Sequence, residues 1–392
     1  MTPANVLASV QSALAARTPL DIIAHGSKRR IGPPSTATET LDLSNLTGVT
    51  LYEPEELVLS ALAGTPIAEI DTLLSANGQQ LAFEPMDYGP LLGGKPGRGT
   101  IGGVLATNTC GPRRLKAGAA RDHVLGVEAV SGRGELFKSG GRVMKNVTGY
   151  DLSKGLTGSW GTLAILTTVT FKVLPAAETE QTLVLRGLDD AEAAVAMALA
   201  MGSNAEVSSA AHLPETVTGK VIGGALAGAS STLLRIEGFP TSVTYRAEKL
   251  AQLLTGKADI LPDAQSRALW RDIRDCTPFS DGTDHPVWRA SVPPMSGHAI
   301  LADFRMHAAA DAFYDWQGGL IWIRCEGDPE AEVLRAIIKR HGGGHATLIR
   351  ASDEQRRTIP VFEPQPPALA ALSKRLKEQF DPMGILNPGR MV

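Results

Sequence analysis

A glycine-rich stretch from residue 93 to residue 111 constrains the fold of this chain more than any other feature. Its sequence is GGKPGRGTIGGVLATNTCG, and it contains no acidic side chain. Glycine permits positive φ angles and lets a ligand approach the backbone closely. A run of N–H groups without a nearby carboxylate suits a pyrophosphate group. Taken alone, the stretch is also typical of a loop that only turns a corner, so its meaning depends on the rest of the chain.

A second candidate anion site precedes this stretch. A predicted strand over residues 20–23 runs straight into the sequence AHGSKRRIG. The backbone at Gly26, the hydroxyl of Ser27 and the ammonium of Lys28 are suited to hold an anion there. An ordinary polar turn is the alternative interpretation.

The first part of the chain alternates predicted helices and strands. Apolar residues at helical spacing predict a helix over 4–16, and Thr65 and Pro66 predict the N-cap and the first residue of the next helix. Strands over 124–130 and 135–138 are joined by Ser-Gly-Arg-Gly, which predicts a hairpin. Further strands are expected over 20–23, 40–43, 57–63, 80–83 and 163–174.

The second part of the chain has a different order of elements. The predicted order is strand–helix–strand–strand–helix–strand, which is that of a ferredoxin-like unit. These elements are expected over 182–185, 191–201, 208–213, 232–237, 243–254 and 259–261. A similar order is expected between residues 287 and 350, which makes an internal duplication a hypothesis. The polar stretch near residue 176 predicts a boundary between two α+β domains, over 1–176 and 177–392.

Charge and cysteine content exclude several classes of protein. The 392 residues carry a formal net charge of −3 with no basic block, which argues against a nucleic-acid-binding surface. Cys110, Cys276 and Cys325 are too few and too widely spaced for a disulfide framework or for the four thiolates of an iron–sulfur cluster. The N-terminus lacks the pattern of a secretory signal, and no apolar run approaches the roughly 20 residues of a transmembrane helix. We therefore expect a cytoplasmic protein.

Four motifs follow one another along the chain in an informative order. They are AHGSKRRIG, GRGTIGGVLATNTCG, KNVTGYDL and ILNPG. Their joint presence resembles the FAD-linked oxidases of the vanillyl-alcohol-oxidase type and, within these, the FAD-binding subunits of bacterial glycolate oxidase. The resemblance is dense over residues 20–175 and returns over residues 376–391.

This resemblance implies a fold and a cofactor. Two small subdomains of the PCMH type would clamp a noncovalently bound FAD, and a ferredoxin-like α+β domain of the FAD-linked oxidase C-terminal type would cover the isoalloxazine ring. The C-terminal tail would return to the FAD domain. The implied cofactor-binding residues are Gly26, Ser27 and Lys28 in the first loop, Gly99, Thr100, Ile101, Gly102, Gly103, Ala106, Thr107 and Asn108 in and after the second loop, Arg121 and Asp122 at the start of the following strand, and Gly161, Thr162 and Ile165 near the adenine.

An activity and partners are implied as well. As a subunit of a glycolate oxidase (glycolate dehydrogenase) complex, the chain would take part in oxidising the 2-hydroxy acid glycolate to glyoxylate. Its partners would be a larger catalytic FAD subunit and an iron–sulfur subunit, which can also hold the chain at the inner face of the cell membrane. The alternatives are a self-sufficient FAD-dependent dehydrogenase of 2-hydroxy acids such as D-lactate, and a structural subunit with a degenerate nucleotide site.

Three features depart from the family pattern. His25 stands where many members have a longer glycine run, which raises covalent attachment of the flavin as an alternative. Trp160 replaces the glutamate of a turn usually written Gly-Ser-Glu-Gly-Thr. The second half lacks the His-x-Gly-Asp-Gly-Asn and Gly-Glu-His-Gly elements of the catalytic members, so no catalytic residue is predicted.

Three arginines of the second half leave two interpretations open. Arg289, Arg324 and Arg350 lie on predicted strands. Each can bind a substrate carboxylate with its planar fork of N–H donors, and each can equally form an ordinary ion pair.

Two remaining clusters have simpler interpretations. Arg113, Arg114 and Lys116 most simply form a solvated basic turn, with docking of a partner subunit as the alternative. His341 and His345 flank three glycines, which disfavour the helix that a two-histidine metal site needs. No metal site is predicted.

Overall fold

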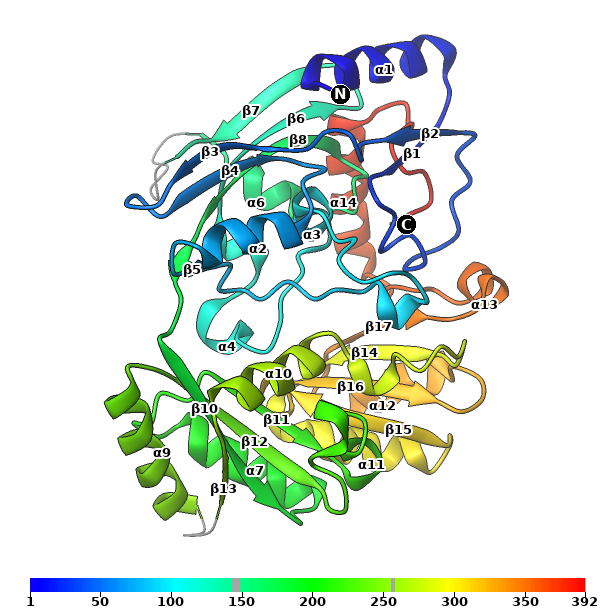
Figure 1. Ribbon diagram of the computed structural model, residues 1–392. Helices are drawn as coiled ribbons and strands as arrows, with labels where there is room; N and C mark the ends of the chain where they lie inside the picture. The colour runs from blue at the N-terminus through cyan, green and yellow to red at the C-terminus, as the bar shows by residue number, and fades with distance from the viewer. Residues whose placement is uncertain (143–148, 255–257, 392) are drawn as a thin grey trace.

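The computed structural model describes residues 1–142, 149–254 and 258–391, and these form two β-sheets with helices packed on them (Figure 1). The mixture of helices and mostly antiparallel strands confirms the predicted α+β class. Residues 145–148 of the KNVTGYDL motif lie outside the described residues. The predicted boundary near residue 176 falls between the strands of the two sheets and stays a prediction.

The N-terminal sheet has five strands in the order β3-β4-β8-β6-β7, each antiparallel to its neighbours. They are β3 (Val49–Glu53), β4 (Val58–Leu62), β6 (Val124–Ser131), β7 (Leu136–Gly140) and β8 (Ala164–Lys172). Two short pairs accompany them, β1 (Leu20–Ile23) with β2 (Glu39–Asp42) and β5 (Gln79–Gln80) with β9 (Leu174–Pro175). The helices of this part are α1 (Pro3–Ala16), α2 (Ile67–Ser75), η1 (Pro90–Leu92), α3 (Ile101–Thr107), α4 (Arg114–Ala117), α5 (Ala120–His123) and α6 (Leu152–Leu156).

Two details of this sheet differ from the sequence predictions. Strand β3 was not expected, because its residues are half-buried or exposed and lack a clear apolar alternation. Pro66, rather than Thr65, is the N-cap of α2. The hydroxyl of Thr65 donates to the carbonyl of Leu62 (2.7 Å) and accepts from the N–H of Gly48 (3.0 Å), so it closes a turn instead of capping the helix.

The C-terminal sheet has eight strands in the order β13-β10-β12-β11-β15-β16-β14-β17. Its strands are β10 (Thr179–Arg186), β11 (Ser209–Leu213), β12 (Ser231–Gly238), β13 (Asp259–Leu261), β14 (Val287–Ser291), β15 (Ala310–Asp315), β16 (Leu320–Cys325) and β17 (His345–Arg350). The first four have the strand order of a ferredoxin-like unit, and the last four repeat it in mirror order across the β11–β15 pair. The recurrence predicted from the sequence is therefore present in the topology.

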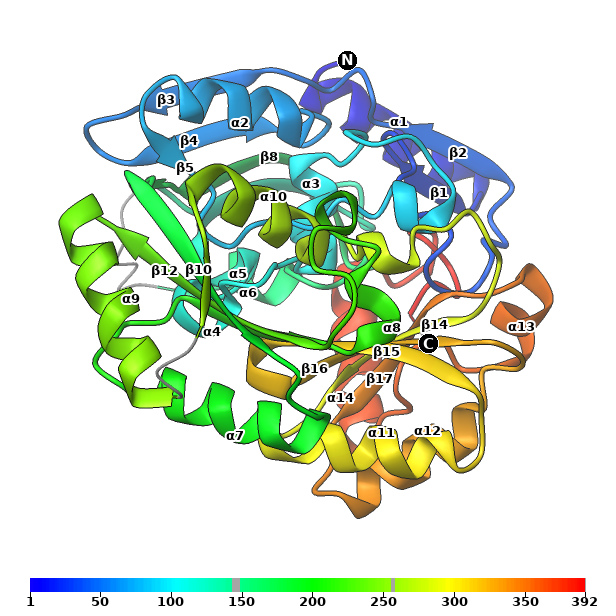
Figure 2. The same ribbon diagram turned by 60° about the horizontal axis from the view of Figure 1, so that its bottom comes forward.

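Helices cover both faces of this sheet. Helices α7 (Asp190–Met201), α9 (Pro240–Leu254), α11 (Gly297–Arg305) and α12 (Ala331–Arg340) lie on one face (Figure 2), and α11 was not predicted. Helix α10 (Asp263–Arg274) lies on the other face and packs with residues of the N-terminal part. The remaining helices are α8 (Glu215–Thr218), η2 (Ile222–Gly224), η3 (Thr277–Phe279), η4 (Pro294–Ser296), η5 (Trp316–Gly318), α13 (Asp353–Thr358) and α14 (Pro367–Phe380).

A buried ionic cluster joins the two sheets. Arg235 on β12 is 2% exposed and donates to both carboxylate oxygens of Glu84 at 2.9 Å. Arg113 binds Glu84 and Glu237 from the other side. Burial disfavours these charges, yet the two guanidinium groups outweigh it and lower the pKa of Glu237 to about 2. The interpretation of Arg113 as part of a solvated turn is therefore wrong.

The C-terminal tail returns to the first strand of the chain. The N–H of Leu20 donates to the carbonyl of Ile385 (2.7 Å), and Leu20 pairs with Leu386 in a parallel bridge. Figure 1 shows the tail in red beside β1 and β2. The tail thereby reaches the loop that follows β1.

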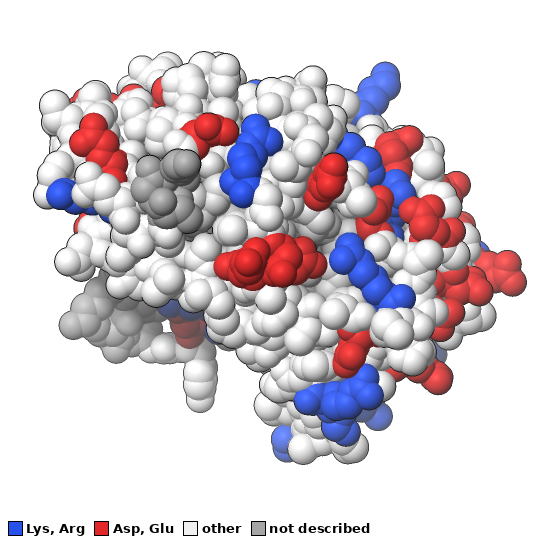
Figure 3. Space-filling model, turned by 90° about the horizontal axis from the view of Figure 1, so that it is seen from below, with Lys and Arg blue, Asp and Glu red and all other residues white. Residues whose placement is uncertain are grey.

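Acidic and basic side chains are interspersed on the face drawn in Figure 3, and this face has no large patch of one sign. In the described part of the chain, no helix has the length and apolar character needed to cross a membrane.

Candidate functional site

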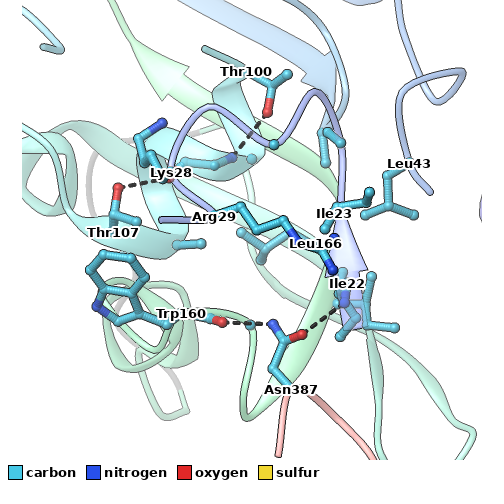
Figure 4. Close-up of a pocket in the computed structure, with 18 of the residues that line it drawn as sticks. Ile22, Ile23, Lys28, Arg29, Leu43, Thr100, Thr107, Trp160, Leu166 and Asn387 are labelled. Atoms are coloured by element: carbon cyan, nitrogen blue, oxygen red, sulfur yellow. Dashed lines mark hydrogen bonds between the residues drawn. The ribbon is translucent and has the colours of Figure 1, made fainter. Parts of the chain in front are cut away.

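A cavity that is open to solvent lies between the loop after β1, helix α3, the turn before β8 and the C-terminal tail (Figure 4). The predicted site residues that line it are Gly26, Ser27, Lys28, Thr100, Gly102, Gly103, Ala106, Thr107, Gly161 and Ile165. Segments more than 350 residues apart in sequence thus meet in one cavity.

The remaining predicted residues lie beside the cavity without lining it. They are Gly99, Ile101, Asn108, Arg121, Asp122 and Thr162. Arg121 and Asp122 form part of the short helix α5 rather than opening the strand, because the Asp122 carboxylate accepts from the N–H of Ala119 (2.8 Å) and closes that turn. Contact of any of these residues with a cofactor stays a prediction.

Helix α3 forms one wall of the cavity, and the role of its glycines differs from the one predicted from the sequence. The N–H groups of Ile101 and Gly102 donate to the carbonyls of Thr65 (3.0 Å) and Ala63 (2.9 Å), so they are not available to a ligand. A Cβ atom on Gly102 would lie 2.7 Å from the Cβ of Ala63. Gly102 therefore allows α3 to pack against the end of β4, rather than leaving room for a phosphate.

Gly103 is the glycine of α3 that borders the ligand space. A Cβ atom there would lie 3.5 Å from the Nζ of Lys28 and 3.2 Å from the hydroxyl of Thr100. The Thr100 hydroxyl caps the helix by accepting from the N–H of Gly103 (3.3 Å). The absence of a side chain at this position keeps the space in front of the Lys28 ammonium open.

Lys28 is the cation that the first loop presents to the cavity. The residue is buried, with 8% of its surface exposed. Burial lowers its pKa to about 8, and Asp87 only partly opposes this shift. In the described residues no carboxylate forms a salt bridge with it, whereas the neighbouring Arg29 pairs with Asp21. A buried ammonium without an anion is costly, and a ligand phosphate would relieve that cost.

His25 provides a second unsatisfied group in the same loop. Its Nδ1 atom is buried and has no hydrogen-bond partner among the described residues. Buried polar atoms in native proteins are nearly always paired. Together, His25 and Lys28 fit a polar, negatively charged ligand at this end of the cavity.

The turn before β8 is fixed to the end of α3. The N–H of Gly158 donates to the carbonyl of Leu105 (3.0 Å), and the N–H of Trp160 donates to the carbonyl of Ala106 (2.8 Å). Trp160 has a positive φ of 54° and lines the cavity. The centre of its ring lies 5.2 Å from the ring centre of Phe362. The tryptophan that replaces the family's glutamate is therefore a wall of the cavity, which suits an aromatic ligand.

Asn387 in the ILNPG motif connects the two sides of the cavity. Its Oδ1 accepts from the N–H of Ile22 (2.7 Å), and its Nδ2 donates to the carbonyl of Trp160 (2.9 Å), as Figure 4 shows. Arg390 donates to the carbonyls of Lys28 (2.9 Å) and Arg29 (3.1 Å). The tail thus holds the first loop and the turn at residue 160 in place.

Sequence reasoning missed Trp160, Asn387 and Arg390 as site residues. The sequence contained part of this information, because the ILNPG motif supported the family resemblance, but no role was predicted for its side chains. Which distant backbone groups Asn387 would bridge depends on the three-dimensional path of the tail.

Comparison with known proteins identifies the family. The model of the family described as "FAD binding domain" matches residues 1–140. The glycolate oxidase subunit GlcE of Escherichia coli (strain K12) is 34% identical over 392 residues, which cover 98% of this chain and 96% of that protein. The chain belongs to the GlcE family of FAD-linked oxidases.

More distant relatives share the fold or part of the sequence. A D-lactate dehydrogenase of Archaeoglobus fulgidus is 28% identical over 84% of this chain and 76% of its own length. The structure of p-cresol methylhydroxylase superposes on 98% of this chain and 86% of its own chain with a TM-score of 0.70 at 15% identity. This likeness confirms the predicted PCMH-type fold.

Replacing Lys28 by methionine tests the charge that this GlcE-family chain presents to its ligand. We expect the Kd for FAD to rise by about 10- to 100-fold, because a hydrogen bond to a charged group contributes roughly 1.5–3 kcal/mol. Quenching of flavin fluorescence measures the Kd. The matched control is Lys138→Met, since the side chain of Lys138 is 66% exposed on β7. Equal affinity of Lys28→Met and the wild type would remove Lys28 from the site.

The wild type should also show a pH dependence that Lys28→Met lacks. The Lys28 pKa of about 8 in the free protein rises when an anion binds, so binding takes up a proton at alkaline pH. FAD affinity is therefore constant well below pH 8 and falls as the pH rises through about 8. The same fluorescence titration, repeated on both sides of this pH, measures the effect.

Removing the Asn387 side chain tests the connection made by the tail. In Asn387→Ala, the two bridging hydrogen bonds are lost, and we expect FAD to dissociate about 10- to 30-fold faster, since each neutral hydrogen bond contributes roughly 1 kcal/mol and about 1.4 kcal/mol is tenfold. Stopped-flow fluorescence after dilution or competition measures the rate. The control Asn204→Ala alters an exposed asparagine outside the cavity. An unchanged dissociation rate would show that the tail does not hold the cofactor site.

Proposed function

We propose that this chain is the FAD-binding subunit of a glycolate oxidase (glycolate dehydrogenase) complex and takes part in oxidising glycolate to glyoxylate. The observation that carries the proposal is the match to GlcE across 96% of that subunit's length. The cavity supports it, because it is lined by the buried Lys28, which forms no salt bridge among the described residues and has the charge to bind a phosphate.

Residues of all four segments would hold the FAD. Lys28, with the backbone of Gly26 and Ser27, would bind the pyrophosphate, since the N–H groups of these three residues donate to no acceptor among the described residues. Apolar residues such as Ile22 and Leu166 would contact the adenosine part, and Thr107 and Trp160 the flavin part. Bound FAD would supply the acceptor for the hydride of the substrate.

We propose that the FAD is bound noncovalently. Contacts from the first loop, α3, the turn and the tail provide many points of attachment without a covalent bond. His25 has a buried, unpaired Nδ1 and is the residue to examine for the alternative. An intact mass equal to that of the chain after denaturation supports noncovalent binding, and an added FAD mass would overturn it.

The proposed partners are a larger catalytic FAD subunit and an iron–sulfur subunit, in a cytoplasmic complex that can lie at the inner face of the membrane. The relative is itself called a glycolate oxidase subunit. The sequence has three cysteines, fewer than the four thiolates that a cluster usually needs. Electrons from the flavin would then pass to a cluster in a partner.

A second candidate is a self-sufficient dehydrogenase of D-2-hydroxy acids. It is favoured by the D-lactate dehydrogenase that aligns with 84% of this chain, and disfavoured by the closer match to GlcE. The two candidates differ in what the chain does when it is alone.

Anaerobic addition of substrate distinguishes these candidates. We expect the purified chain to contain stoichiometric FAD and to co-purify with two further subunits from its native host. Glycolate should bleach the visible flavin band in the complex, followed by absorption spectroscopy. Bleaching of the chain alone by D-lactate would favour the second candidate. A colourless chain that gains no flavin band with added FAD would overturn both.

A further inference from the structure

The three strand arginines that the sequence singled out have different environments. Arg324 donates to Asp281 (2.7 Å) and Asp311 (3.2 Å), so its charge is neutralised. Arg350 is 2% exposed, and its donors bind the carbonyls of Phe279 and His285 at 2.7 Å. The Nη donors of Arg324 are therefore used by carboxylates, with only its buried Nε unpaired, and the donors of Arg350 are used by backbone and hydroxyl oxygens.

Arg289 on β14 differs from both. It is half-buried, and among the described residues no hydrogen bond or salt bridge is formed by its side chain. Its guanidinium carbon lies 4.8 Å from the ring centre of Trp316 and 6.0 Å from that of Trp322. Stacking on an aromatic face holds the guanidinium while leaving its in-plane N–H donors available.

Arg114 approaches the same tryptophan from the N-terminal part of the chain. Its guanidinium carbon lies 5.1 Å from the ring centre of Trp316, and its Nη1 donates to the Cys110 sulfur at 3.4 Å. Sulfur is a weak acceptor, and no carboxylate within the described residues pairs with Arg114. Two cations that form no salt bridge among the described residues therefore lie around one indole ring, and the neighbouring buried carboxylate, Asp315, is occupied by the N–H of Trp316.

Trp316 is rigidly held between these arginines. Its Nε1 donates to the carbonyl of Gly111 (3.0 Å), and its backbone N–H donates to the carboxylate of Asp315 (2.7 Å). Its φ of 52° lies in the left-handed region that non-glycine residues rarely adopt. Strained, over-determined residues of this kind are concentrated at functional sites.

The imidazole of His345, at the start of β17, lies within the electrostatic influence of Arg289 and Arg114. Desolvation lowers its pKa, Arg289 and Arg114 lower it further, and the carboxylate of Glu363 opposes them, so both positive charges act on this imidazole. Repulsion between like charges at a half-buried site is unfavourable unless an anion binds there.

The arginine pair is connected to the cavity through packed residues. Arg114 follows the end of α3 by seven positions, after Thr107, which lines the cavity. Trp160 in the cavity wall and Cys110 beside Arg114 pack against one hydrophobic cluster that also contains Trp316 and Trp322. An anion bound at the arginines would therefore lie beside the cluster that Trp160 connects to the cavity.

We propose that Arg289 and Arg114, held on Trp316, form a binding site for the carboxylate of the 2-hydroxy acid. This inference rests on the proposed function and assigns the substrate site to this chain rather than to a partner alone. The two cations come from the two halves of the chain, so the site is complete only at their junction.

Calorimetric titration of the FAD-loaded chain with glycolate tests this site. Glycolamide, which has the same shape but no carboxylate, is the ligand control. We expect Arg289→Gln and Arg114→Gln each to weaken glycolate binding by about 10- to 100-fold, the range for a hydrogen bond between charged groups, and to leave glycolamide binding unchanged. The glycolate affinity of Arg289→Lys should lie between those of the wild type and Arg289→Gln, because lysine keeps the positive charge and lacks the planar set of N–H donors. Lys116→Gln, an exposed cation two residues from Arg114, should bind glycolate like the wild type.

The outcomes separate the site from the proposed function. Wild-type glycolate affinity in both arginine variants, or equal binding of glycolate and glycolamide by the wild type, would overturn the site. Failure of the wild-type chain to bind glycolate would also overturn it, even if the complex oxidises glycolate. The flavin content, measured first, reports on the cofactor: a chain that binds no FAD overturns the proposed function, and the same titration of that chain still tests the arginines.

Discussion

The side chain of Asn387 provides the connection on which the rest of the site depends. One amide joins the strand before the first loop to the turn before β8, through the N–H of Ile22 and the carbonyl of Trp160. Both groups lie beside a cavity and would otherwise need water or a ligand as partner. The final residues of the chain therefore complete a site that its first residues begin. The tail follows all strands of the C-terminal sheet along the chain and then returns to β1, where it is needed for this connection.

Charge pairing divides the cations of this chain into two groups. Arg235 and Arg113 are neutralised by buried glutamates and fix the two sheets against each other. Lys28 lines the cavity, Arg114 and Arg289 stack on Trp316, and none of the three forms a salt bridge among the described residues. Breaking a buried pair would leave an uncompensated charge, whereas the unpaired cations are compensated only when an anion binds. The electrostatics thus separate residues that hold the fold from residues suited to ligands.

The sequence predicted the elements whose pattern is local and missed those set by tertiary contacts. The hairpin at residues 131–134 and the ferredoxin-like order were predictable from turn residues and apolar periodicity. Strand β3 was not, because its residues are half-buried or exposed. Helix α11 was missed although Ile300, Leu301 and Phe304 have helical spacing, because the helix is short and begins at a glycine. The glycines of the second loop were recognised, yet the structure gives Gly102 a packing role against Ala63. Which of three similar arginines stays unpaired depended on neighbours that are distant in sequence.

Hydrogen–deuterium exchange with and without FAD tests most directly whether the loop after β1, the turn at Trp160 and the tail close on one cofactor. We expect FAD to slow amide exchange in all three segments together, including residues 385–390, and Asn387→Ala to abolish the slowing in the tail. Protection confined to the loop and turn, with the exchange of the tail unchanged by FAD, would contradict this expectation.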